Sequence, residues 1–410
     1  MSINMDIMPI LSSLRRHLIP AILIICEVAL ACAVMCNAVF MISEKVTDLQ
    51  LANNMDEQGI SVVTIDGSDP DQAVNTIPRN LDLLRGIPGV SSVSITNTLP
   101  LTDNAWQNGF SAQAGEKRTV NTSTYFLASG AERSLGLRLL RGRWFNGDEY
   151  AGGKLNNNYA SVGHSVIITE SYAKRIWPND DALGKTLYSR AGDSYQVVGV
   201  IADVLAPSMT INSGNRNGAY WSAFFPLAPA AGLSYYVIRS DASSRDKILR
   251  SAVDRLSTIE PSAVVKGQTF EAIRDDYFAS TKSTIWILML VCATMLLVTA
   301  FGIVGLSSFW VRQRRRQIGI RRALGARRHD ILAYFHTENF LLSAMGVVIG
   351  MGMAYGVNVL LSQHYEVGRM PLAYLPISAL IIVFIGQLSV LGPAVKASMV
   401  TPVVAIRANG

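Results

Sequence analysis

Four stretches of this 410-residue chain are apolar over about 20 residues, the length that a helix needs to cross a bilayer. We place them at residues 19–42, 284–310, 340–361 and 372–392. Half of the residues are hydrophobic, which is too many for an ordinary soluble protein and too few for a bundle that fills the whole chain. The sequence therefore predicts four transmembrane helices and a sizeable water-soluble domain.

A dense basic loop joins the second span to the third. The segment from Trp310 to Asp330 holds eight arginines: Arg312, Arg314, Arg315, Arg316, Arg321, Arg322, Arg327 and Arg328. Loops rich in Lys and Arg stay on the cytoplasmic side of a membrane. Because basic residues also precede the first span and follow the fourth, we predict that residues 1–18, 311–339 and 393–410 are cytoplasmic. Residues 43–283 and the short loop 362–371 then lie outside.

The charge balance agrees with this topology. Residues 43–283 hold 23 Lys and Arg against 25 Asp and Glu, whereas the whole chain has a net charge of +6. The basic excess is therefore concentrated in the predicted cytoplasmic segments. Nucleic-acid binding is the competing interpretation of an arginine run, but this run lies between two spans and lacks interleaved aromatic residues. We expect no nucleic-acid partner.

The basic loop also contains apolar residues that a merely solvated loop does not need. We interpret it as a short amphipathic helix that docks on a cytoplasmic partner, while its arginines contact carboxylates or lipid phosphates. Ile318, Ile320, Leu324 and Ile331 are the candidate apolar contacts, and the glycines permit a bend or a close backbone approach. The full set of candidate coupling residues is Ile318, Gly319, Ile320, Arg321, Arg322, Ala323, Leu324, Gly325, Asp330 and Ile331.

The first span has two interpretations. Its basic flank and the sequence Ala29-Leu30-Ala31-Cys32 resemble a signal peptide with a lipoprotein cleavage site. However, the apolar run continues to Ile42, longer than a typical signal peptide core, which favours an uncleaved helix.

Residues 43–283 alternate between strand and helix patterns. The segments 60–65, 71–84 and 90–95 read as a β-α-β unit, and the segments 235–239, 245–256 and 263–266 read as a second one. Two such units around an insertion predict a split α/β domain with an inserted subdomain at about residues 100–230, which contains strands at 165–169 and 195–201. Helical stalks around residues 43–54 and 268–280 would join this domain to the spans.

Polar and small residues inside the predicted spans form a second set of candidates. Glu27 is a carboxylate well inside a span, and such a residue either bonds across helices or faces a substrate path. Asn37 and Asn358 are weaker candidates of the same kind. Four glycines in the third span have small-xxx-small spacing, which serves packing within one subunit or between two subunits. They are Gly346, Gly350, Gly352 and Gly356.

Nothing in the sequence predicts catalysis or a metal site on this chain. The exterior segment has a single histidine, His164, and no cysteine, so it folds without disulfides. The sequence Gly184-Lys185-Thr186 has the ending of a phosphate-binding loop, but Asn179 stands where the first glycine is required. We therefore expect no catalytic residue, no metal ligand and no bound cofactor on this chain.

Several motifs resemble one known family, the MacB-like permeases of type VII ABC transporters, a superfamily that includes FtsX-type and lipoprotein-releasing LolC-type permeases. The segment RQIGIRRALGA at residues 316–326, followed by Asp330-Ile331, is similar to the family signature, with Gln317 where glutamate is usual. The exterior segments 87–90, 137–143 and 166–204 and the terminal TPVVAIR at 401–407 also resemble the family.

This resemblance implies a permease subunit without a fused ATPase domain, located in the bacterial inner membrane. It implies a cytoplasmic ABC ATPase dimer that binds ATP and Mg²⁺, and a second permease subunit, either identical or related. It further implies mechanotransmission, in which ATP hydrolysis moves the periplasmic domain and drives efflux of an antibiotic, peptide or other amphiphile. A periplasmic adaptor and an outer-membrane channel would complete such a tripartite pump, and membrane lipids surround the spans.

Two other functions remain open within the same superfamily. An FtsX-like scaffold would transmit ATPase motion to cell-wall hydrolases, and a third type of member extracts lipoproteins or lipids from the membrane. The large exterior domain favours the exporter.

Overall fold

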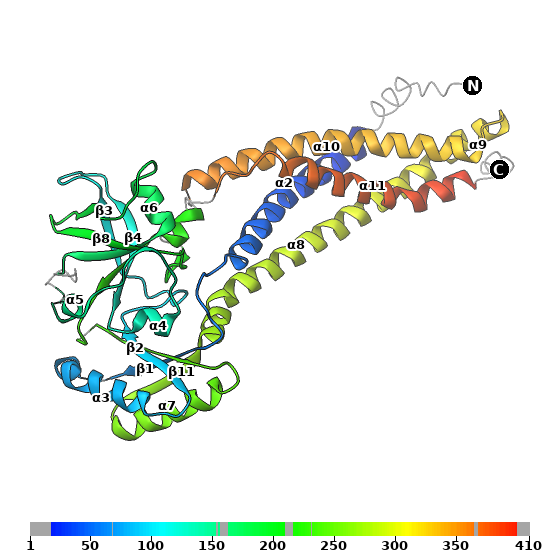
Figure 1. The fold of residues 1–410 in the computed structure, drawn as a ribbon. Helices are drawn as coiled ribbons and strands as arrows, with labels where there is room; N and C mark the ends of the chain where they lie inside the picture. The colour runs from blue at the N-terminus through cyan, green and yellow to red at the C-terminus, as the bar shows by residue number, and fades with distance from the viewer. Residues whose placement is uncertain are drawn as a thin grey trace. The chain divides into compact units, whose positions relative to one another are not determined.

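The structure, a computed structural model, describes residues 18–67, 69–152, 155, 163–209, 216–230, 232–364 and 368–399 (Figure 1). The chain divides into two compact units. The helical unit comprises residues 1–50 and 281–410, and the globular unit comprises residues 51–280. Of the predicted cytoplasmic ends, 1–18 and 393–410, residues 1–17 and 400–410 lie outside the described residues, together with the TPVVAIR segment.

Within the described residues, four helices are long and apolar enough to cross a membrane. They are α2 (Leu18–Leu49), α8 (Phe270–Gln313), α10 (Arg328–His364) and α11 (Tyr374–Ser398). Each contains the greater part of one predicted span, and α2 and α8 continue beyond their apolar windows. Helix α8 begins directly after the last strand of the globular unit, so the segment predicted as its stalk is the first part of one unbroken helix. These helices and the globular unit confirm the predicted fold class.

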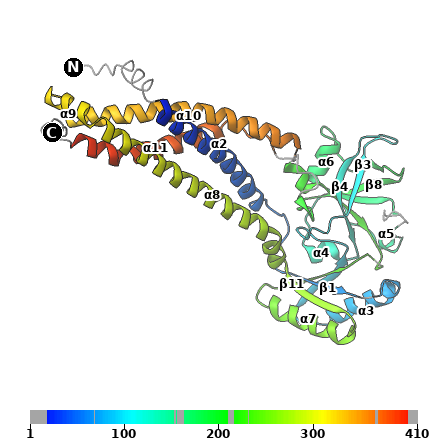
Figure 2. The same ribbon diagram turned by 180° about the vertical axis from the view of Figure 1, so that it is seen from behind.

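Helix α2 packs against α10 and α11 (Figures 1 and 2). Its buried face consists largely of small side chains, including Ala29, Ala31 and Cys32. Gly346 and Gly350 of α10 lie against this face, where a Cβ at Gly350 would come within 2.5 Å of the Ala29 carbonyl oxygen. Small residues on both helices therefore permit a close approach of the two backbones.

Four strands of the globular unit pair antiparallel in the order β11-β1-β10-β2 and form one end of an 11-stranded sheet. The strands are β1 (Ile60–Asp66), β2 (Val90–Thr96), β10 (Tyr235–Ser240) and β11 (Val264–Thr269). Helices α3 (Ala73–Arg85) and α7 (Arg245–Ile259) lie side by side in both views, and both contact this sheet (Figures 1 and 2). The order and connections are those of a split β-α-β fold, built from both ends of the unit as the alternating pattern predicted.

The insertion between β2 and β10 forms a small barrel. Its strands pair in the closed circuit β4-β3-β7-β8-β6-β9, in which β9 returns to pair in parallel with β4. The strands are β3 (Gln107–Ser111), β4 (Val120–Leu127), β6 (Ser165–Thr169), β7 (Thr186–Ser189), β8 (Ser194–Ile201) and β9 (Ser222–Pro226), with β5 (Leu139–Gly142) paired to β8. Closure leaves few unpaired strand edges, since the barrel strands hydrogen-bond to neighbours on both sides.

Short helices complete this region. They are α4 (Ala131–Leu135), α5 (Gly147–Gly152) and α6 (Glu170–Ile176), and 3₁₀ turns occupy Pro70–Gln72 and Arg216–Tyr220.

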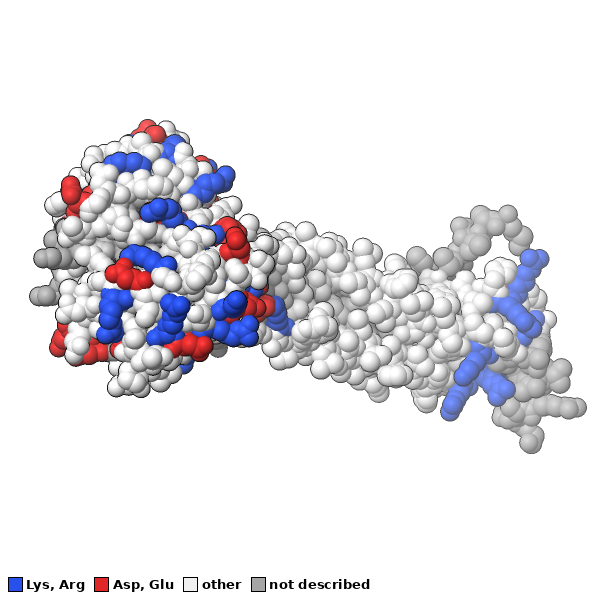
Figure 3. Space-filling view, turned by 60° about the horizontal axis from the view of Figure 1, so that its bottom comes forward, with Lys and Arg blue, Asp and Glu red and all other residues white. Residues whose placement is uncertain are grey.

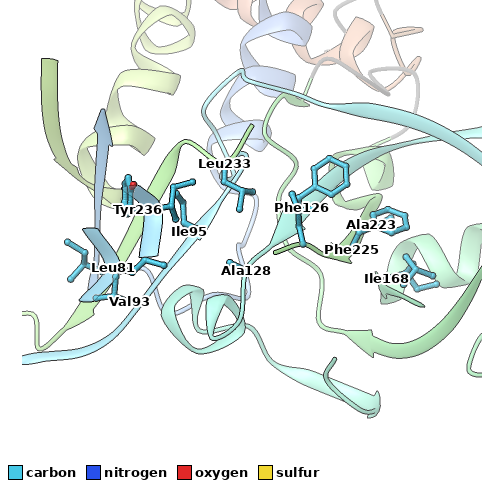
Figure 4. Close-up of a cluster of buried hydrophobic side chains, with 14 of the residues drawn as sticks. Leu81, Val93, Ile95, Phe126, Ala128, Ile168, Ala223, Phe225, Leu233 and Tyr236 are labelled. Atoms are coloured by element: carbon cyan, nitrogen blue, oxygen red, sulfur yellow. The ribbon is translucent and has the colours of Figure 1, made fainter. Parts of the chain in front are cut away.

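Figure 4 shows the core that joins the sheet to the barrel. Leu81 of α3 and Val93 of β2 belong to the same buried cluster as Phe126 of β4 and Ile168 of β6. Because the sheet and the insertion share one core, they form one folding unit.

Charged side chains are distributed differently over the two units (Figure 3). The globular unit carries Lys, Arg, Asp and Glu intermixed. The helical unit shows a broad uncharged belt, with Lys and Arg gathered at one end. This belt is the surface expected of helices whose outer side chains face lipid.

Candidate coupling site

The basic loop folds into a separate short helix, α9 (Arg315–Ala323), between α8 and α10. Helix α8 ends at Gln313, and Arg314 interrupts the helical path with φ −96° and ψ 10°. In Figures 1 and 2, α9 lies at the end of the helical unit, beside the start of α10. The arginines of α9, which are Arg315, Arg316, Arg321 and Arg322, therefore project from a folded helix.

Gly325 ends α9 through a pair of backbone hydrogen bonds. The Gly325 N–H donates to the Arg322 carbonyl, and the Ala326 N–H donates to the Arg321 carbonyl, both at 3.1 Å. This is a Schellman motif, which requires a residue of positive φ directly after the helix cap. Gly325 has a φ of +101°, which only glycine adopts without strain.

Asp330 starts α10. Its Oδ2 accepts a hydrogen bond from the Arg327 backbone N–H at 2.8 Å, and its own N–H donates to the Arg327 carbonyl at 3.2 Å. A carboxylate in the first turn also faces the positive end of the helix dipole. The structure therefore gives Asp330 a capping role.

Arg314 is buried, unlike most arginines of the loop. It is 7% exposed, and its Nη1 donates to Glu338 Oε1 at 2.9 Å and to Oε2 at 3.1 Å. The same nitrogen lies 3.3 Å from the Tyr334 hydroxyl, and the guanidinium lies over the Trp310 ring. Since Glu338 belongs to α10, this ion pair ties the α8–α9 junction to the neighbouring helix.

The candidate apolar contacts divide into two pairs. Ile318 and Ile331 are each 6% exposed and pack in the core of the helical unit, as does Gly319 next to Ile318. By contrast, Ile320 is 46% exposed and Leu324 is 83% exposed. The first pair fixes α9 to α10 and does not project from the surface, so these two side chains pack within the unit as well. The other pair is free on the surface.

The remaining candidates of the loop line the exposed side of α9. Arg321 and Ala323 are exposed, and Arg322 is partly buried. The Arg321 guanidinium lies over the Tyr334 ring, with its carbon 5.0 Å from the ring centroid. Cationic and apolar groups thus alternate over a small surface.

The structure separates the candidates inside the spans. Asn37 of α2 donates to the Ala354 carbonyl of α10 at 3.2 Å and to the Ala33 carbonyl of its own helix. Asn358 accepts a hydrogen bond from the Met370 N–H at 2.9 Å. Both amides therefore have a structural role.

Glu27 lies against Gly302 of α8. A Cβ built at Gly302 would lie 2.2 Å from Glu27 Oε1, so the absence of a side chain there makes room for the carboxylate. The four candidate glycines also divide. Gly346 and Gly350 pack on α2, whereas among the described residues nothing lies within 4 Å of a Cβ at Gly352 or Gly356.

The exterior histidine, His164, lies directly before strand β6. His164 is exposed and precedes Ser165, whose hydroxyl donates to Glu149. A double hydrogen bond from Arg143, at 2.7 and 3.0 Å, holds the pKa of the Glu149 carboxyl at about 2. No group of three His, Cys, Asp or Glu side chains able to hold a metal occurs in the part of the chain that the structure describes.

Sequence reasoning missed the Arg314–Glu338 pair. Arg314 looked like one more topology-determining arginine, and Glu338 lay just before the third predicted span. The sequence did contain one sign of this pair. Glu338 lies within an apolar helical pattern, and a buried carboxylate requires a partner.

Two family models match the chain. The MacB-like periplasmic core domain matches residues 26–256, more than half of the chain. The chain belongs to the MacB-like permease family. The FtsX-like permease C-terminal domain matches residues 289–402, which contain most of α8 and all of α9, α10 and α11. The chain is thus an ABC transporter permease with a periplasmic domain in the globular unit.

Two relatives of this chain are named as export proteins. The chain is 24% identical over 373 residues to the macrolide export ATP-binding/permease protein MacB of Chromobacterium violaceum, covering 85% of this chain and 52% of that relative. It is 30% identical over 253 residues to the pyoverdine export ATP-binding/permease protein PvdT of Pseudomonas aeruginosa, covering 59% of this chain and 37% of that relative. The chain spans about half or less of the length of these relatives, and both family models that match it are permease models.

Among solved structures, the periplasmic region of MacB from Actinobacillus actinomycetemcomitans is similar to this chain with a TM-score of 0.37 and 14% identity. The similarity covers 54% of this chain and 92% of that one. The extracellular domain of the transporter YknZ from Gram-positive bacteria gives a TM-score of 0.34 at 14% identity, covering 50% of this chain and 99% of that one.

Proposed function

We propose that this chain is the permease subunit of an exporter that a separate cytoplasmic ABC ATPase drives. The ATPase binds ATP and Mg²⁺ and docks on α9, and its closure moves the periplasmic domain to expel a periplasmic amphiphile, such as an antibiotic or a peptide. The exporters among the relatives support this choice of function.

One observation carries the docking proposal. Leu324 and Ile320 are exposed on a short helix that also bears Arg315, Arg316 and Arg321. Apolar side chains that project between arginines suit a protein groove with acidic edges, because the groove desolvates the apolar groups while the edges pair with the charges. The hydrocarbon core of a bilayer does not accommodate these charges, and bulk water does not desolvate Leu324.

Energy transfer requires that α9 does not rotate freely. Ile318 and Ile331 in the core, together with the buried Arg314–Glu338 pair, attach α9 to α10. Motion imposed on α9 is therefore passed to a span, and α8 continues as one helix into the globular unit. The family resemblance supplies the rest of the mechanism, including a dimer of permeases.

Affinity purification from native membranes tests this proposal. We expect an ABC ATPase to co-purify, and Leu324→Asp or Ile320→Asp to abolish its recovery without lowering the yield of permease. Leu183→Asp, at an exposed leucine of the globular unit, is the matched control and should retain the ATPase. Folded permease without any ATPase would contradict the proposal.

The other proteins in the same eluate distinguish the functions of the superfamily. A periplasmic adaptor supports efflux. A cell-wall hydrolase would replace efflux by the FtsX-like scaffold, and ATPase activity stimulated by a lipoprotein would replace it by extraction.

A further inference from the structure

Helix α9 and the first turns of α10 enclose a recess of about 270 Å³. Its apolar lining includes Ile318, Ile331 and Phe335, all nearly fully buried. Arg321, Leu324 and Asp330 also line it, and all three are exposed. An apolar recess beside charged groups is typical of a binding site that buries an apolar group of the ligand and fixes its orientation through the polar groups nearby.

The recess follows from the way the chain reverses direction. The Schellman motif at Gly325 and the capping bonds of Asp330 place α9 and α10 only a short turn apart. Ala326, at the turn, has too small a side chain to fill the space between the helices. Arg321 and Tyr334 also line the recess. The Arg321 guanidinium lies over the Tyr334 ring, and this contact helps to fix the shape of the recess.

The size of the recess restricts its occupant. Pockets for drug-sized ligands measure about 300–1,000 Å³, so this one is at or below the lower limit. One large apolar side chain fits it better than a transported amphiphile. Side chains of this kind, buried in a pocket at the centre of an interface, carry most of the binding energy in protein complexes.

The charge around the recess restricts the occupant further. Arg315, Arg316, Arg321, Arg327 and Arg328 are exposed on these two helix segments. From residue 315 to 335, Asp330 is the single carboxylate of the sequence, and the α10 cap and His329, at 3.0 Å, engage it. The surface therefore complements a segment that carries Asp or Glu beside its apolar side chain.

We propose that this recess is a socket for one aromatic or long aliphatic side chain from an acidic segment of the ATPase subunit. This inference rests on the proposed function. Docking then runs in both directions, with Leu324 entering the ATPase and an ATPase side chain entering the permease. Two reciprocal insertions beside one another resist sliding, since Leu324 lies at the wall of the recess, so a sideways movement of the ATPase is passed to α9 and α10 together.

Filling the recess tests the proposal. Ala326→Phe places a ring inside it, and Gln317→Phe fills it from α9 should the first variant fold poorly. The dissociation constant of the co-purified ATPase is measured for the full-length permease in nanodiscs. We expect either variant to weaken binding at least tenfold. The matched control is Ala333→Phe, an exposed alanine of α10 outside the recess, which should change binding less than threefold.

A double-mutant cycle supplies a second readout. Crosslinking identifies the ATPase segment at the recess, and its apolar residue is changed to alanine. That change should weaken binding to the wild-type permease and have no further effect on the Ala326→Phe variant, because both changes remove the same contact.

Each alternative result is distinguishable. If Leu324→Asp abolishes binding and the filling variants do not, the docking surface stands and the socket is refuted. Equal losses for Ala333→Phe and Ala326→Phe also refute it. Loss of a bound anionic phospholipid from the Ala326→Phe variant, with unchanged ATPase affinity, would assign the recess to lipid. If no ATPase binds the wild-type permease, the proposed function itself fails.

Discussion

Arg314 and Glu338 are 24 positions apart in the chain, yet Arg314 Nη1 lies 2.9 Å from Glu338 Oε1 with both side chains almost completely enclosed. The pair lies where α8 ends and α9 begins, so it holds α9 against α10. Arg314 belongs to the basic loop in the sequence, but in the structure it holds two helices of the helical unit together.

Removing one member of this pair should destabilise the helical unit strongly. Arg314→Met leaves the Glu338 carboxylate buried without its partner, which costs about 3–5 kcal/mol in comparable proteins. The double variant Arg314→Met, Glu338→Leu should recover much of this loss, because an apolar pair needs no compensating charge. Thermal unfolding of the purified protein in detergent measures both. An unchanged midpoint for Arg314→Met alone would contradict the buried pairing.

Alanine at two neighbouring glycines should have opposite effects. A Cβ at Gly350 would lie 2.5 Å from the Ala29 carbonyl oxygen, so Gly350→Ala should force α10 away from α2 and cost about 1–3 kcal/mol. Gly352→Ala meets open space and should be neutral or stabilising by up to about 1 kcal/mol, since alanine is the better helix former. Unfolding midpoints distinguish them. An equal loss at Gly352 would mean that another surface packs there.

Gly302 should be sensitive because of Glu27. Gly302→Ala places a methyl group where the Glu27 carboxylate lies, and we expect a lower unfolding midpoint. Gly305→Ala, with nothing within 4 Å, is the matched control on the same helix. Combining Gly302→Ala with Glu27→Ala should relieve the clash, giving a coupling energy of about 0.5–3 kcal/mol. Additive effects of the two changes would argue against this contact.

Acid should weaken the globular unit through Glu149. Its pKa falls from the ordinary 4.5 to about 2 because Arg143 donates two hydrogen bonds to the ionised carboxylate. The stabilisation is complete above pH 4.5, where the unfolded glutamate is also ionised, and it is lost as the pH falls toward 2. Glu149→Gln should lower stability at pH 7 and flatten this acid dependence.

Hydrogen exchange of the α5 segment in the full-length protein measures the effect. We expect roughly 1–3 kcal/mol, a range discounted because Arg143 is partly exposed to solvent. Identical acid dependence in the wild type and Glu149→Gln would show that the pair does not contribute.

Local patterns determined much of the fold. Apolar windows of membrane-spanning length predicted α2, α8, α10 and α11, because crossing a bilayer imposes a length and a composition that any sequence must show. Alternating and helical periodicities similarly placed β1, β2, β10 and the helices α3 and α7, since these patterns depend on residues close together in the chain. The closure of β9 on β4 was not predictable, because the pairing of distant strands leaves no periodic trace.

The candidate site shows the same division. The sequence showed the arginines and the apolar residues among them, and it suggested a bend or a close backbone approach at Gly325, since these are local properties. Only the tertiary structure decided that Ile318 and Ile331 belong to the core while Ile320 and Leu324 remain free. It also decided that Arg314 pairs with Glu338 and that a recess remains between α9 and α10. Burial and ion pairing depend on which distant helix arrives beside a residue, and that is set by the packing of the whole unit.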